Sequence, residues 1–143
     1  MGLNAEIICD GIHIHPAVVH MMFGAMANHM ILISDSISPT GLSDGKYESG
    51  GLFIEVKEGK ASLADGTLAG STITLFDAVK NAVKFKIPLE QALYAATYIP
   101  AKAIGFEKEI GSIACGKVAD LLIVNNDLEL EQVIIRGNFL NKD

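Results

Sequence analysis

The chain is poor in cysteine and in basic residues, and it lacks a long apolar run. Its two cysteines, Cys9 and Cys115, lack the close spacing of zinc knuckles and disulfide frameworks. There are 11 Lys and Arg against 17 Asp and Glu, which argues against nucleic acids and anionic membranes as partners. No apolar stretch approaches the roughly 18 residues of a membrane span, and no signal-peptide pattern opens the chain. We therefore expect a cytoplasmic protein.

Half of the 143 residues are apolar, enough to form one hydrophobic core. Residues 5–9 and 30–34 are short apolar runs, typical of strands buried on both faces of a parallel sheet. Residues 16–28 lie between them and predict a helix, because Pro16 suits a first turn and apolar residues follow at spacings of three and four. The N-terminal part is therefore predicted to be strand, helix, strand.

The remaining chain changes from polar to helical to β-rich. It predicts an α/β fold that resembles the end of a barrel followed by strands of a small second sheet. The predicted elements begin with a polar loop (35–50), a β-hairpin (52–63) and a turn (65–67). A helix capped by Thr74 follows, and then a second helix that begins at Pro88 and whose end is marked by Pro100 and Gly105. The tail strands are predicted at 111–113, 119–124 and 132–135.

Titratable side chains follow both apolar runs, and reactive groups of parallel α/β barrels sit at the C-terminal ends of strands. Asp35 follows the second run, where it could act as a general base on a bound water or as a metal ligand. Asp is also common in turns, so a structural cap is an equal alternative.

His13 and His15 would face the same side of a strand, a spacing that suits a divalent metal. A metal site needs three or four ligands, however, and His20 and His29 lie in or at the end of the predicted helix. We therefore favour substrate contact by His13 alone. Asp10 is expected to order its own turn, and Cys9 to be a small core residue.

Small residues at 67–72 precede a predicted helix. Such residues let backbone N–H groups approach a ligand. On these residues alone, an ordinary helix entry is the preferred interpretation.

Several motifs resemble the N-acetylglucosamine-6-phosphate deacetylases, a family of amidohydrolases. Two are specific to these deacetylases: residues 10–13 (Asp-Gly-Ile-His) and residues 66–71 (Gly-Thr-Leu-Ala-Gly-Ser). Residues 34–36 also match, with Ser34 where Thr is usual. The tail, residues 100–105 and 111–121, resembles many amidohydrolases, and Cys115 stands where Pro is frequent.

The resemblance implies the C-terminal part of a longer, metal-dependent (β/α)₈ barrel enzyme. Residues 1–104 would supply the last two barrel strands with an inserted β-hairpin. Residues 105–143 would supply C-terminal strands of a small β-sandwich.

The implied activity is hydrolysis of the acetamide of N-acetylglucosamine 6-phosphate to glucosamine 6-phosphate and acetate. Asp35 matches the catalytic carboxylate, which lies near the metal. His13 matches a substrate contact, and Leu68, Ala69 and Gly70 match a backbone stretch that lines the sugar pocket.

The resemblance further implies a divalent metal, zinc or iron, whose Glu and two His ligands come from earlier strands outside this sequence. His15 matches no ligand of the family, and we expect no metal ligand within this chain. The expected partners are the amino-sugar phosphate and either the rest of the barrel or another copy of the chain, in a homo-oligomer. The alternatives are a non-catalytic fragment or association module of the same fold, and another amidohydrolase such as a dihydroorotase or aminoacylase relative.

Overall fold

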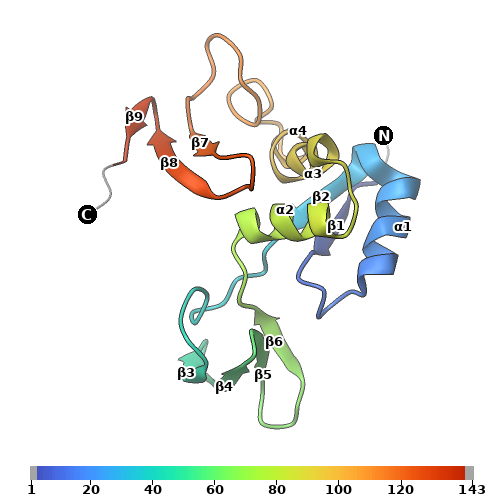
Figure 1. Cartoon of the computed structure of the whole chain (residues 1–143), viewed down its shortest axis with the longest axis vertical. Coiled ribbons are helices and arrows are strands. Elements are labelled where there is room, and N and C mark those ends of the chain that lie inside the picture. The colour runs from blue at the N-terminus through green and yellow to red at the C-terminus, as the bar shows by residue number, and fades with distance from the viewer. Residues whose placement is uncertain (1–2, 141–143) are drawn as a thin grey trace. The chain divides into compact units, whose positions relative to one another are not determined.

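The computed structural model describes residues 3–140 and divides the chain into two compact units, Met1–Ala96 and Thr97–Asp143. The first unit begins with the predicted strand, helix, strand. Strands β1 (Ala5–Ile8) and β2 (Met30–Ile33) pair in parallel, with Ile7 opposite Leu32. Helix α1 (Pro16–Met26) and a short 3₁₀ helix (Ala27–His29) connect them, so the predicted helix over 16–28 ends in a tighter turn (Figure 1).

The core of the first unit forms around this strand pair. Helices α2 (Leu75–Lys84) and α3 (Leu89–Ala96) both pack against β2, as does α1. Helix α2 begins with the predicted capping box, in which the side chains of Thr74 and Asp77 each accept from the other's backbone N–H. The core contains side chains from all of these elements: Ile7, Cys9, Val19, Phe23, Met30, Leu32, Ala78, Val79, Ala82, Ile87, Ala92 and Ala95.

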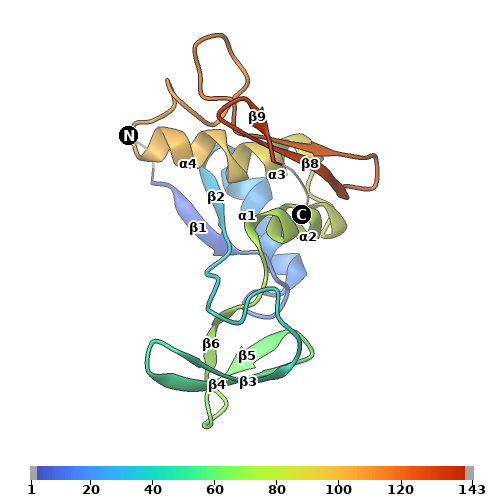
Figure 2. The same cartoon turned by 90° about the vertical axis from the view of Figure 1, so that its left-hand side faces the viewer.

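A second sheet of the first unit has the antiparallel order β3-β4-β5-β6 (Figure 2). The predicted hairpin forms its centre, β4 (Leu52–Lys57) and β5 (Lys60–Ser62), with Ile54, Val56 and Ala61 as a small separate core. Two predictions beside it are wrong. Residues 35–50 contain strand β3 (Gly45–Ser49), and the segment predicted as a helix entry contains strand β6 (Leu68–Ser71).

The second unit begins with helix α4 (Tyr98–Ala103) and ends in an antiparallel sheet of β7 (Leu121–Val124), β8 (Leu130–Ile135) and β9 (Asn138–Phe139). Pro100 lies in the first turn of α4 and does not end a helix there, because a first-turn residue needs no backbone donor. The strand predicted at 111–113 is wrong, since residues 111 and 112 form a bend, residue 113 is irregular, and Gly111 has φ +84°.

No helix within residues 3–140 is long and apolar enough to span a membrane. The assignment of residues 1–104 to a barrel and of 105–143 to a sandwich concerns the longer fold and stays a prediction.

Candidate active site

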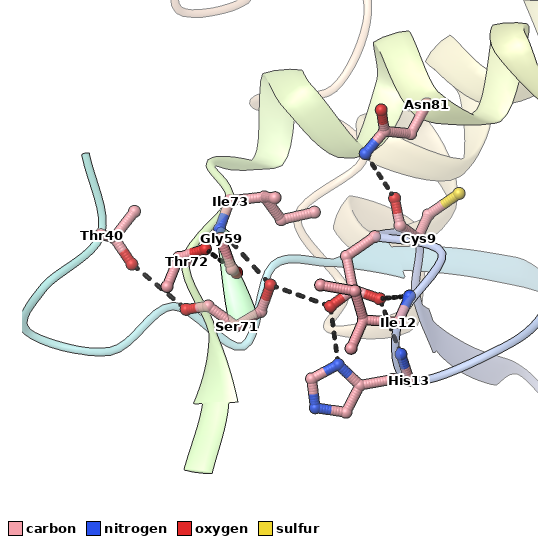
Figure 3. Close-up of polar contacts among 10 residues, drawn as sticks. Cys9, Ile12, His13, Thr40, Gly59, Ser71, Thr72, Ile73 and Asn81 are labelled. Carbon is pink, nitrogen blue, oxygen red and sulfur yellow. Dashed lines mark hydrogen bonds and ion pairs between the residues drawn. The ribbon is translucent and has the colours of Figure 1, made fainter. Parts of the chain in front are cut away.

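The end of β1 is fixed by one carboxylate. Asp10 accepts hydrogen bonds from the backbone N–H groups of Ile12 (2.8 Å) and His13 (2.9 Å), so it orders its own turn as predicted. The same carboxylate pairs with His13 Nδ1 at 2.6 Å and accepts from Ser71 Oγ at 3.3 Å. Figure 3 shows His13 and Ser71 reaching this carboxylate from two different segments of the chain.

Asp10 is buried, with 2% of its side chain exposed, whereas the His13 side chain is 18% exposed. Burial alone would raise the pKa of Asp10, but the backbone N–H groups of His13 and Ile12 and the His13 side chain together hold it below its ordinary value. Asp10 is therefore a charged group committed to internal partners.

Asp35 follows β2 in a different setting. Its side chain is exposed, and its backbone has φ +49° in the left-handed region, which Asp tolerates better than most residues. The Asp35 carbonyl accepts from the backbone N–H of Ser71 at 2.9 Å, and Ile37 N–H donates to the Ser71 carbonyl at 3.1 Å. These bonds join the end of β2 to the end of β6.

The strand β6 passes directly beside Asp35. A Cβ on Gly70 would lie 2.7 Å from Ile37 Cγ2, 3.1 Å from the Asp35 carbonyl oxygen and 3.6 Å from Asp35 Oδ2. Gly70 also has φ +101°. Only glycine permits both this approach and this backbone conformation. Gly70 and Ser71 of β6 therefore lie next to Asp35.

Ser71 is the residue that sequence reasoning missed. Its side chain is buried, at 3% exposed, and its backbone and hydroxyl bond to the ends of both β1 and β2. The only signal in the sequence is its place in the motif at 66–71. Its contact with Asp10 spans 61 residues, which no local pattern reveals.

The histidine pair serves two different purposes. His15 caps α1, with Nδ1 accepting from Ala17 N–H at 3.2 Å, while His13 Nδ1 faces Asp10. Within residues 3–140, no group of three His, Cys, Asp or Glu side chains is placed to hold a metal ion. These described residues do not by themselves form a complete metal site.

Cys9 is fully buried in the core, as predicted, and burial raises the pKa of its thiol to about 12. It is therefore not a nucleophile. The exposed Asp35 carboxylate and the His13 imidazole remain as the candidate reactive groups at the strand ends.

The amidohydrolase family model matches residues 7–140. The chain belongs to the amidohydrolase family. The match takes in both strand ends and the tail, and it accounts for the strand-end location of Asp35 and His13.

Among relatives of this amidohydrolase, the N-acetylglucosamine-6-phosphate deacetylase of Vibrio furnissii is 36% identical over 136 residues, which are 94% of this chain and 34% of that protein. The crystal structure of the Pasteurella multocida enzyme of the same name superimposes with a TM-score of 0.92 at 31% identity. It covers 97% of this chain and 37% of that chain. The chain thus spans about a third of the length of these relatives.

A shorter relative also matches. The putative N-acetylgalactosamine-6-phosphate deacetylase of Escherichia coli K12 is 32% identical over 133 residues, which make up 80% of that protein. These similarities confirm the predicted α/β fold, a part of the amidohydrolase barrel with strands of the small β-domain.

Proposed function

We propose that this protein hydrolyses the acetamide of N-acetylglucosamine 6-phosphate, giving glucosamine 6-phosphate and acetate in amino-sugar catabolism. The observation that carries the proposal is the close approach of Gly70 and Ser71 of β6 to the exposed Asp35 at the end of β2. The names of the Vibrio furnissii and Pasteurella multocida relatives supply the substrate.

Asp35 would act first as base and then as acid. Its carboxylate takes a proton from the water that attacks the acetamide carbon, and it returns that proton to the nitrogen as the C–N bond breaks. An amine is a poor leaving group, so this second transfer is needed for hydrolysis. A carboxylate exposed at a strand end is supported in this role by its access to water.

His13 and the segment Leu68–Gly70 would hold the sugar phosphate. The His13 ring nitrogen Nε2 lies on the other side of the ring from the Nδ1 contact with Asp10 (Figure 3), and it would be the atom that contacts the ligand. The absence of a side chain at Gly70 lets β6 lie against Ile37 and Asp35, which supports a place for this strand at the site.

Members of this family are in general metal-dependent, and we propose that a divalent ion, zinc or iron, is held by residues outside this chain. We further propose a homo-oligomer in the cytoplasm, with the rest of the barrel or another copy of the chain completing the β1–β2 sheet. Within residues 3–140, β1 and β2 pair only with each other, so this sheet has open edges, which supports an association with further strands. The free thiols of Cys9 and Cys115 support the cytoplasm.

The test uses the complete protein, meaning the natural product that contains this chain, whatever its length. It is purified and incubated with N-acetylglucosamine 6-phosphate, and released acetate and free amine are measured together. N-acetylgalactosamine 6-phosphate, named by the Escherichia coli relative, is the comparison substrate. Equal yields of both products from the glucosamine compound, at a higher kcat/KM, are expected. Failure to release acetate from it would refute the proposal.

A further inference from the structure

The Asp10 carboxylate has more donors around it than a turn requires. Two backbone N–H groups already order the turn at Asp10 Oδ1. The other oxygen, Oδ2, faces His13 Nδ1 at 2.6 Å and Ser71 Oγ at 3.3 Å. One oxygen therefore shapes the backbone, and the other holds two side chains.

This arrangement decides where the His13 ring carries a proton. An ionised carboxylate only accepts hydrogen bonds, so a ring nitrogen 2.6 Å from it must be the donor. The hydrogen bonds from His13 and Ile12 outweigh the effect of burial and hold the pKa of Asp10 below its ordinary value, so this carboxylate is charged. The proton is then on Nδ1, and Nε2 is directed away from Asp10 (Figure 3).

The support for Asp10 comes from separate elements. Asn81 Nδ2, on α2, donates to the carbonyl of Cys9 at 3.0 Å and fixes the residue before Asp10. Ser71 brings β6 to the same carboxylate while its backbone N–H bonds to Asp35. A ring held in this way is rigid before a ligand arrives, which lowers the entropic cost of binding.

We propose that Asp10 is a positioning residue for His13: its Oδ2 holds the proton on Nδ1 and directs Nε2 to the amino-sugar phosphate, with Ser71 as the second support. This proposal rests on the proposed function for the identity of the ligand. The placement of the proton does not depend on that function.

The first measurement needs no substitution. The complete protein is labelled with ¹⁵N-histidine, and the His13 signals are assigned from a His13→Gln variant. A proton on His13 Nδ1 is expected at neutral pH. A bare Nδ1 would overturn the proposal.

The second measurement uses Asp10→Asn. The Asn Oδ1 can still accept from both backbone N–H groups, but its Nδ2 is a donor, so His13 Nδ1 must become the acceptor and the ring proton must move to Nε2. Replacing a carboxylate that orients a metal-ligating histidine reduces metal affinity or activity about 10–100-fold. We expect a rise in KM of about that order here, with a smaller change in kcat. Retention of the proton on Nδ1, or a moved proton with an unchanged KM, would overturn the proposal.

Asp77→Asn is the matched control. Asp77 is a carboxylate bonded to backbone and side chain in the α2 cap, with a lowered pKa, as for Asp10, but it lies outside the site. It should lose stability without moving the His13 proton or the KM. If the unmodified protein released no acetate, the proposed function would fail. The labelling experiment would then still decide the placement of the proton.

Discussion

Asp10 and Asp35 follow neighbouring parallel strands, yet their side chains have opposite surroundings. Asp10 is buried, accepts from four donors and has a lowered pKa. Asp35 is exposed, and its backbone is in the left-handed region. The end of a strand therefore determines where a carboxylate lies but not what it does. The number of internal partners decides whether a carboxylate serves structure or is available to react.

The largest effect should come from removing the charge of the exposed carboxylate. In the complete protein, Asp35→Asn should lower kcat about 10²–10⁴-fold, the usual contribution of a general acid–base group, with little change in the free energy of unfolding. Steady-state kinetics and urea unfolding measure the two quantities. Asp127→Asn, at an exposed turn of the second unit, is the control and should change neither. Near-parental turnover in Asp35→Asn would contradict a catalytic role for the Asp35 carboxylate.

The next effect concerns the strand that lies against Asp35. Gly70→Ala places a methyl group 2.7 Å from Ile37 Cγ2 at a φ of +101°, and overpacking with left-handed strain costs about 2–4 kcal/mol in total. Gly66→Ala is the matched control, because its φ is +87° but nothing lies within 4 Å of the added Cβ. It should cost about 1–2 kcal/mol. Equal losses of unfolding free energy would show that close approach at Gly70 is unimportant.

A smaller effect is expected on the pH dependence of stability, to which Asp10 contributes through its lowered pKa. The pKa of Asp10 is lower in the folded than in the unfolded chain, so the unfolded chain binds protons first on acidification. The stability from ionised Asp10 is therefore present above about pH 4, the ordinary Asp pKa, and is lost as the pH falls through the folded value. Urea unfolding between pH 6 and 3 should show a steeper decline for the unmodified protein than for Asp10→Asn. Asp65 and Asp77 also have lowered pKa values, but they contribute equally to the pH dependence of both proteins. Parallel plots of unfolding free energy against pH would therefore contradict a contribution from Asp10.

The smallest effect tests the backbone of Asp35. Asp35→Gly should leave stability unchanged or raise it by up to about 1 kcal/mol, because relief of left-handed strain exceeds the entropic cost of glycine. The same change also removes the carboxylate, so kcat should fall about 10²–10⁴-fold, as in Asp35→Asn. Thermal unfolding measures the first outcome. A clear loss of stability would mean that the Asp35 side chain supports the fold, as Asp10 does.

Local patterns predicted much of the fold. The apolar runs gave β1 and β2, and Thr74 with Asp77 gave the start of α2. Strand β3 was missed because Gly45–Ser49 is polar and is stabilised by pairing with β4. Strand β6 was missed because Leu-Ala-Gly-Ser has weak β propensity and is held by bonds to residues distant in the sequence, including Asp35.

The candidate site was predictable only in part. The positions of Asp35 and His13 were evident, because the ends of the two apolar runs mark the ends of the strands. The bond between Asp10 and His13 depends on a turn geometry that spacing does not determine, and the contact with Ser71 depends on tertiary structure. The roles of Asp35, His13 and Leu68–Gly70 stay predictions.

The bond between Ser71 and Asp10 has a consequence for the order of folding. His13 is three residues from Asp10, whereas Ser71 is 61 residues away. Closing the longer loop costs about 3 kcal/mol more chain entropy, so the turn at β1 can form early, while β6 joins after most of the first unit is in place. The contact between β6 and the strand ends is thus completed last. Destabilised variants should lose ligand binding through local opening of β6 before they lose their helices.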